Sequence, residues 1–164
     1  MNSRFGHMRG VLFALVLGWL AVGAGPAEAQ QGLATFERDG LILHTAEGAE
    51  LTFDIELAVS PQQQSQGLMY RQNLAADAGM LFLYRPAREV SMWMKNTLIP
   101  LDMLFIAEDG IVVRVAERTV PLSLTTISSG ERVRAVLEIN GGMASRLGIR
   151  PGDRVVHPAF ERSP

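Results

Sequence analysis

The sequence predicts a mostly β fold, an antiparallel β-sandwich or barrel-like single domain with two short helices. Short segments in which apolar and polar residues alternate recur along the chain, as expected for half-buried strands. Turn residues join most of these segments as hairpins, and no strand–helix–strand unit repeats. The chain has 164 residues, and the part that follows Ala29 is long enough for one hydrophobic core and one domain.

The N-terminal segment 1–29 has the pattern of an export signal. Arg4 and Arg9 provide positive charge, residues 11–22 form an apolar run, and Ala27-Glu28-Ala29 has the small-x-small form of a cleavage site. The run is shorter than the roughly 20 residues that span a bilayer. We therefore predict a signal peptide over residues 1–29, a periplasmic or secreted protein, and no stable membrane span after cleavage. Retention of this segment as an anchor is the alternative.

The predicted domain covers residues 41–157, between a flexible lead-in at 30–40 and a frayed C-terminus at 158–164. The clearest strand is 51–59, where five apolar residues alternate with smaller or polar ones. A hairpin is predicted around Glu108-Asp109-Gly110, and residues 121–130 form a long polar loop. The expected strands are 41–45, 51–59, 79–84, 90–95, 101–107, 111–117, 133–139 and 154–157.

Two short helices are expected beside these strands. Ser60 can cap a helix that begins with Pro61, because proline suits the first helical turn, and this helix should reach about Met69. Asn140 can cap a second helix over residues 141–147, which Gly148 ends.

Composition excludes several classes of function. The chain has no cysteine, which rules out disulfides, thiol catalysis, zinc–thiolate sites and iron–sulfur clusters. Its 15 basic and 17 acidic residues form no basic stripe, so we expect no nucleic-acid partner. Met92 and Met94 have a Met-x-Met spacing that suits copper(I), but their alternation favours core positions. We therefore predict no metal and no cofactor.

The segment 91–102 carries the strongest signal of a functional site. Lys95 is the only lysine, against 14 arginines, and Trp93 is the only tryptophan outside the predicted signal peptide. A strand over 90–95 would bury the methionines and turn Trp93 and Lys95 outward beside a turn. This pattern predicts an exported binding or accessory module for an unknown small molecule or envelope component. The candidate ligand-binding residues are Trp93, Lys95, Asn96, Thr97 and Asp102, with Arg71 and Glu138 as neighbours.

Three other interpretations fit the same residues. In the first, Trp93 is buried and Lys95 forms a surface pair with Asp102. In the second, the protein is an envelope-associated hydrolase that uses Lys95 or an Asp102/Glu138 carboxylate pair, although Glu138 also fits a solvated strand face. In the third, a structural domain binds a partner through an exposed apolar patch. The sequence predicts no oligomeric state.

Six motifs occur in order along the chain and carry a family resemblance. They are Gln-Gly-Leu-Met-Tyr-Arg at 66–71, Gly-Met-Leu-Phe at 79–82, Trp-Met-Lys-Asn-Thr at 93–97, Ile-Pro-Leu-Asp at 99–102, Ala-Val-Leu-Glu-Ile-Asn-Gly-Gly at 135–142, and Gly-Ile-Arg-Pro-Gly-Asp at 148–153. Over residues 41–157 the chain resembles the bacterial and archaeal family catalogued as domain of unknown function 192. The resemblance implies a compact, mostly β, sandwich-like domain that is often exported. It implies no established activity, substrate or cofactor, and Met92 stands where an aromatic residue is common.

Overall fold

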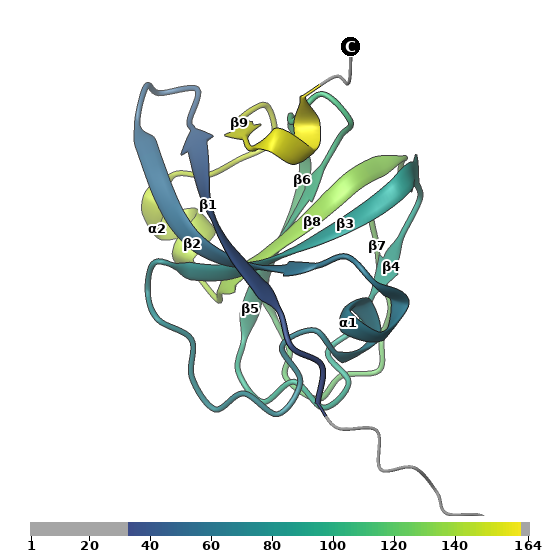
Figure 1. Cartoon of the computed structure of the whole chain (residues 1–164). Coiled ribbons are helices and arrows are strands. Elements are labelled where there is room, and N and C mark those ends of the chain that lie inside the picture. The colour runs from purple at the N-terminus through teal and green to yellow at the C-terminus, as the bar shows by residue number, and fades with distance from the viewer. Residues whose placement is uncertain (1–32, 162–164) are drawn as a thin grey trace, which may run out of the picture. The chain divides into compact units, whose positions relative to one another are not determined.

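A single curled sheet of seven strands dominates the structure. This computed structural model describes residues 33–161, so the predicted signal peptide lies outside the described residues. The strands follow the order β6-β5-β8-β3-β2-β1-β9 and curl into a half-barrel (Figure 1). Their bounds are β1 (Glu37–His44), β2 (Glu50–Ala58), β3 (Ala78–Arg88), β5 (Leu101–Ile106), β6 (Val112–Thr119), β8 (Val133–Asn140) and β9 (Arg154–Val156).

The remaining elements are short. Strands β4 (Ser91–Met92) and β7 (Ile127–Ser128) form a separate two-stranded sheet. The helices are α1 (Pro61–Gln66), α2 (Met143–Leu147) and the 3-10 turn η1 (Pro158–Phe160). The predicted mostly β, barrel-like single domain with two short α-helices is thus confirmed. Among residues 33–161, no helix is long and apolar enough to cross a membrane.

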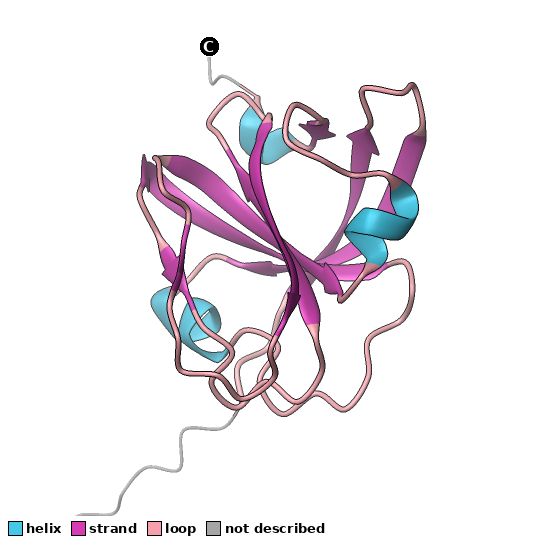
Figure 2. Cartoon of the chain, turned by 180° about the vertical axis from the view of Figure 1, so that it is seen from behind, coloured by secondary structure: helices cyan, strands magenta, loops and turns pink. Residues whose placement is uncertain are grey.

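One strand pairing departs from the expected antiparallel pattern. Strands β2 and β3 run parallel, whereas every other named pairing in the described chain is antiparallel. Parallel neighbours cannot be joined by a tight turn, so the chain must cross from one end of the sheet to the other. Residues 59–77 make this crossing and include α1. Helix α1, β4 and β7 lie on the same side of the sheet (Figure 2).

The start of the edge strand β6 contacts the other edge strand, β9, through backbone hydrogen bonds. The N–H of Val112 donates to the carbonyl of Asp153, and the N–H of Val155 donates to that of Gly110, both at 2.8 Å. A Cβ atom at Gly110 would lie 2.6 Å from the Val155 carbonyl oxygen, so glycine is required there. These bonds occupy backbone groups that an open sheet edge would leave unpaired.

Both faces of the central strands are buried. One hydrophobic cluster fills the inside of the curl and includes Leu81, Leu104 and Leu137. A second cluster lies on the outer face of the same strands, beneath α1 and the segment after β3, and includes Phe82 and Met103. All six residues of β5 are buried, including Asp102, the only polar one among them. The outer layer determines where a pocket can form.

Several local boundaries differ from the predicted ones. Strand β1 begins at Glu37, inside the expected lead-in, because all eight of its residues pair with β2. The 3-10 turn occupies part of the expected frayed C-terminus, where the ring of His157 accepts a hydrogen bond from the N–H of Ala159. Helix α1 has the predicted Ser60 cap, completed by Gln63, but it ends at Gln66.

The expected strand over residues 90–95 is also shorter. Only β4 pairs, and the chain then turns at Asn96, whose φ of 55° is left-handed. Met94 is nevertheless buried while Trp93 and Lys95 are exposed, so the predicted alternation of faces is retained. The partner of β4 is β7, which lies within the expected polar loop.

Candidate functional site

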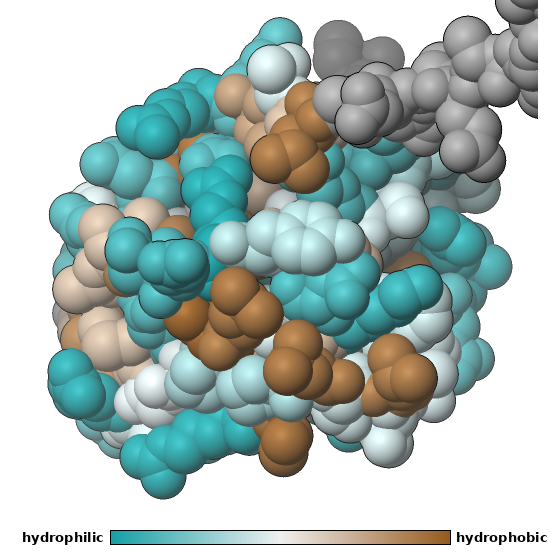
Figure 3. Space-filling view, turned by 90° about the horizontal axis from the view of Figure 1, so that it is seen from below, coloured by the Kyte–Doolittle hydropathy of each residue, from teal (hydrophilic) through white to brown (hydrophobic). Residues whose placement is uncertain are grey.

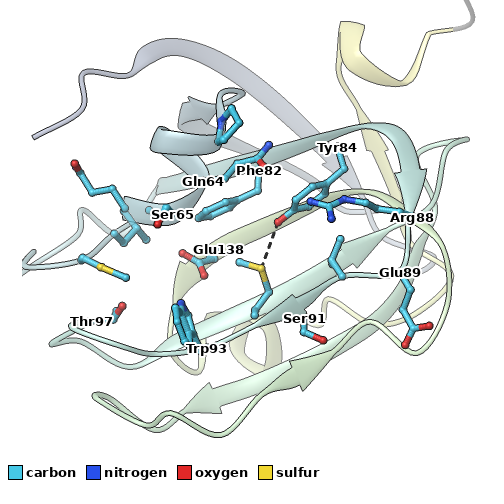
Figure 4. A pocket seen from close by; sticks show the side chains of 17 residues that line it. Gln64, Ser65, Phe82, Tyr84, Arg88, Glu89, Ser91, Trp93, Thr97 and Glu138 are labelled. Atoms are coloured by element: carbon cyan, nitrogen blue, oxygen red, sulfur yellow. Dashed lines mark hydrogen bonds between the residues drawn. The ribbon is translucent and has the colours of Figure 1, made fainter. Parts of the chain in front are cut away.

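A pocket of about 390 Å³ opens between the outer face of the sheet and the layer that covers it (Figure 4). Helix α1 and the turn after it form one wall. Phe82 and Tyr84 of β3 form another, and residues 88–93 close the third side. Thr97 and Glu138 complete the lining. The pocket therefore forms where the crossover between β2 and β3 and the segment after β3 incompletely cover the sheet.

Glu138 lies on the sheet at the centre of this pocket. In β8, Leu137 and Ile139 point into the curl, so Glu138 points to the outer face. Its side chain lies between those of Met80 and Met103, its direct partners on β3 and β5. Glu138 is only 4% exposed, and this burial raises the pKa of its carboxyl to about 8. Within residues 33–161, no hydrogen bond or ion pair is made to this carboxyl.

The burial of Glu138 corrects one sequence expectation. A solvated strand face was the plainer interpretation of this alternating strand, and it is wrong. Strand polarity predicts which face a side chain takes but not whether that face is covered. Here α1 and residues 88–97 cover it.

Tyr84 connects the aromatic wall to the charged groups of the pocket. Its hydroxyl donates to Sδ of Met92 at 3.4 Å. The Arg88 guanidinium lies 5.0 Å from the centroid of its ring, as in a cation–π contact. Burial and then the nearby Glu138 raise the pKa of Tyr84, whereas Arg88 acts in the opposite direction. The phenol therefore stays neutral and serves as a hydrogen-bonding group.

Trp93 and Thr97 are the predicted site residues that join Glu138 in lining the pocket. Trp93 is 45% exposed, and Nζ of Lys95 lies 5.2 Å from its ring centroid. Thr97 is buried, and its hydroxyl donates to the Lys95 carbonyl at 3.3 Å. The segment 93–97 thus contributes to the pocket through its tryptophan and threonine.

Lys95, Asn96 and Arg71 have other places in the structure. Lys95 lies outside the pocket lining, against the ring of Trp93. Asn96 donates from its amide to the hydroxyl of Tyr70 at 2.9 Å, which holds the left-handed turn. Arg71 makes two hydrogen bonds to Glu56, and this contact raises the pKa of its guanidinium. This ion pair borders a different pocket.

Asp102 faces the inside of the curl, opposite to Glu138. It pairs with Ile139 across β5 and β8, whereas Glu138 pairs with Met103, so the two carboxyls point to opposite faces of the sheet. The Asp102 carboxylate is fully buried and accepts the backbone N–H groups of Arg118, Gly142 and Ala144 at 2.7–2.8 Å. The Asp102/Glu138 pair is therefore not assembled. Asp102 is bound by backbone groups at the start of α2, and not by Lys95.

The methionines gather around the pocket, which the sequence analysis did not foresee. Met69 and Met92 line it, and Met80 and Met103 flank Glu138. Met94 is buried, and its sulfur accepts a hydrogen bond from Thr119. Their density in the sequence was a usable signal for this outer layer, because Met suits irregular apolar walls. The described residues contain no group of three or more His, Cys, Asp or Glu side chains that could hold a metal ion.

Exposed apolar side chains lie beside the pocket. Residues 93–98 and 120–124 are joined by hydrogen bonds from Met94 N–H to the Ser123 carbonyl and from Leu122 N–H to the Thr97 carbonyl. Figure 3 shows apolar side chains scattered among polar ones on the lower face of the molecule. The exposed apolar residues of the two segments are Trp93, Leu98, Val120, Leu122 and Leu124.

Comparison with known proteins identifies relatives of the whole domain. A model of the family DUF192, described as Uncharacterized ACR, COG1430, matches residues 42–157. A crystal structure from Sinorhizobium meliloti 1021, provisionally described as a transcription regulator, is 48% identical, with a TM-score of 0.76 over 78% of this chain and 99% of that chain. A protein of unknown function from Novosphingobium aromaticivorans DSM 12444 is 37% identical, with a TM-score of 0.71 over 76% of this chain and 94% of that chain. No curated protein shows significant sequence similarity to the chain.

Proposed function

The chain belongs to the DUF192 family, which is uncharacterised, and we propose that it is an exported module that binds a small organic molecule in the pocket above Glu138. One observation carries this proposal. Glu138, a residue that is 4% exposed and whose carboxyl has no ion-pair partner in the described chain, faces a pocket of about 390 Å³. Ligand sites typically combine a largely apolar lining with a few convergent polar groups.

The energetics of Glu138 favour a role in function over a role in folding. A largely buried carboxyl with no ion-pair partner opposes folding, because its charged form loses much of its hydration and keeps only its contact with the pocket. An apolar residue between Met80 and Met103 would suit the same position on the sheet. Sites that carry strongly perturbed ionisable groups in a cleft are candidates for binding or catalysis.

The pocket walls suit an organic molecule of moderate size. Trp93 offers a large, partly exposed ring at the mouth, and Tyr84 presents an aromatic wall farther along. Met69 and Met92 add flexible apolar surface that adapts to the shape of a ligand. The volume lies near the lower end of the range for small-molecule pockets, about 300–1,000 Å³.

The export half of the proposal rests on the sequence of residues 1–29. A positively charged start, a short apolar run at 11–22 and a small-x-small ending are typical of a cleaved signal. We therefore propose that the protein resides in the periplasm or the extracellular medium. The ligand would then be a small metabolite or a fragment of an envelope component.

A hydrolase is the second candidate, and the pKa of Glu138 favours it. A carboxyl whose pKa is about 8 can donate or accept a proton at neutral pH, as a general acid–base group does. Such an enzyme would depend on Glu138 and on the pocket hydroxyls, because Lys95 and Asp102 do not line the pocket. Turnover of a substrate that is lost in Glu138→Gln would establish it, and turnover that persists would eliminate this version.

Binding can be tested with a panel of small amines, carboxylates, alcohols and sugars, followed by amide NMR shifts of the full chain. We expect at least one chemical class to shift residues around Trp93, Tyr84 and Glu138. Ser65→Trp, on the exposed pocket side of α1, should block these shifts. Ser145→Trp on α2, which is also exposed but does not line the pocket, is the matched control and should not. A panel with no shifts at the pocket, or shifts insensitive to Ser65→Trp, would overturn the proposal.

A further inference from the structure

The floor of the pocket holds an acidic group whose direct neighbours on the sheet are uncharged. On the sheet, Glu138 lies between two methionines, Met80 and Met103. Helix α1 contributes the neutral side chains of Gln64 and Ser65 to the pocket. No lysine or arginine within residues 33–161 makes an ion pair with the Glu138 carboxyl, so the group best suited to balance its charge would have to come from a ligand.

The charged groups nearest to this floor are engaged elsewhere. Arg88 is stacked on the ring of Tyr84, and Lys95 is stacked on the ring of Trp93. Glu89, at the pocket rim, accepts a hydrogen bond from the hydroxyl of Ser128 at 2.9 Å. Tyr84 is the other titratable group that faces Glu138, and it stays protonated across the neutral range.

The walls around this carboxyl attract positive charge as well. Aromatic faces carry negative quadrupole density, and Phe82 lines the pocket together with Tyr84 and Trp93, whose rings already have Arg88 and Lys95 beside them. The thioether sulfurs of Met69 and Met92 are polarisable and weakly accepting. An anion would find only one basic side chain in the lining, Arg88, and would disfavour ionisation of Glu138.

Resting on the proposed function, we infer that the ligand of this pocket is an organic cation, an amine or guanidinium group on an apolar or aromatic body, and that the Glu138 carboxylate holds its charge. The cationic head would sit on the sheet between Glu138 and the aromatic rings. The apolar body would lie against Trp93 and the methionines at the mouth.

Capture of such a cation releases a proton. The empty site keeps Glu138 neutral over most of the physiological range, because burial raises its pKa to about 8. The bound cation favours the carboxylate, so the carboxyl proton passes to solvent as the ligand enters. Apparent affinity therefore rises about tenfold per pH unit below pH 8 and levels off above it. The affinity for a neutral ligand that hydrogen-bonds the protonated carboxyl does not rise with pH in this way.

Three probes of one shape separate the possible ligand charges. Benzylamine, benzyl alcohol and benzoate are titrated into the full-length protein at several pH values between 6 and 9, and amide NMR shifts report the site and the dissociation constant. At pH 8 we expect benzylamine to bind at least about tenfold more tightly than benzyl alcohol, the range that a charge-assisted hydrogen bond gives. Benzoate should leave the pocket signals unmoved.

Two matched glutamate-to-glutamine variants locate the effect. Glu138→Gln keeps the shape of the side chain but cannot ionise, so it should remove both the preference for benzylamine and its rise with pH. Glu117→Gln, which is exposed on β6 and does not line the pocket, should retain both. The pH dependence in the unmodified protein tests the inference even if Glu138→Gln does not fold. Tighter binding of benzyl alcohol or benzoate at the pocket would refute the inference that the ligand is a cation, but the proposal that the pocket binds a small molecule would stand. If no class of compound in the broader panel bound, both the inference and the proposal would be refuted.

Discussion

Replacing Glu138 by glutamine should change the pH dependence of stability in a specific direction. The folded protein holds a proton on this carboxyl up to a pKa of about 8, whereas a solvated glutamate in the unfolded chain releases it near the ordinary value of 4.5. Between these values the folded state binds more protons than the unfolded state. The free energy of unfolding therefore falls as pH rises through this window. Ionisation of Glu138 therefore leaves the free energy of unfolding unchanged below pH 4.5, lowers it between pH 4.5 and about 8, and lowers it no further above that.

The size of the effect follows from the two pKa values. A difference from 4.5 to about 8 corresponds to about 5 kcal/mol once both states have ionised. At pH 7, where the unfolded chain has ionised and the folded state has not, the penalty is already about 3 kcal/mol. Glutamine has no charge to desolvate, so Glu138→Gln removes this penalty. We expect the variant to gain about 4 kcal/mol relative to the unmodified protein between pH 5 and pH 9.

Urea denaturation followed by circular dichroism at pH 5, 7 and 9 measures this difference. Other titrating groups change the stability of both proteins in the same way, so the gap between them isolates Glu138. Glu89→Gln at the rim is the control and should run parallel to the unmodified protein. A gap that stays constant within about 1 kcal/mol would refute the reasoning, because Glu138 would then ionise as a solvated carboxylate does.

Two further predictions concern the fold around the site. Asp102→Ala leaves three backbone N–H groups without their acceptor and should lower the free energy of unfolding, measured by urea denaturation, by about 3–5 kcal/mol. Lys95→Ala should change this free energy by less than about 0.5 kcal/mol. Equal effects of the two variants would show that the two side chains depend on each other. Leu122 has a left-handed φ of 62° and is 58% exposed, so Leu122→Asn should raise the melting temperature by relieving up to about 1 kcal/mol of backbone strain, and a lower melting temperature would contradict this.

The fold was readable from the sequence where a single rule decides the outcome. Alternation in 51–59 predicted β2 within one residue at each end, and Ser60-Pro61 predicted the start of α1. The parallel pairing of β2 with β3 was not readable, because alternation gives the face of a strand but not its neighbour. Pairing along β1 likewise begins in a stretch whose own pattern looks like a lead-in, so only its partner strand defines it.

The candidate site was readable in part for the same reason. The segment 93–97 was found from its rare residue types, and two of its members line the pocket. Asp102 lies outside the pocket, which the sequence could not show because a buried aspartate that binds backbone N–H groups looks, in sequence, the same as one that binds a ligand. The sequence predicted the face of the strand that carries Glu138 but not that this face is buried. Helix α1 covers this face only through the tertiary fold. Both carboxyls are buried, which the predicted arrangement did not include, because no local sequence pattern encodes burial.

Left-handed backbone conformations occur in the loops next to the pocket lining. The sheet floor is rigid and is shared with the main core, so the shape of the pocket mouth must be set by the loops that cover it. Tyr70, Asn96 and Leu122 have left-handed backbone conformations although none is glycine, and hydrogen bonds link Tyr70 to Asn96 and Leu122 to Thr97. Such conformations persist only where the surrounding structure holds them, and they gather at binding and catalytic sites. An unpaired acid on the sheet and three strained residues beside the pocket lining are two departures from what stability alone would select, whereas the fourth such residue of the described chain, Arg118, donates its backbone N–H to Asp102.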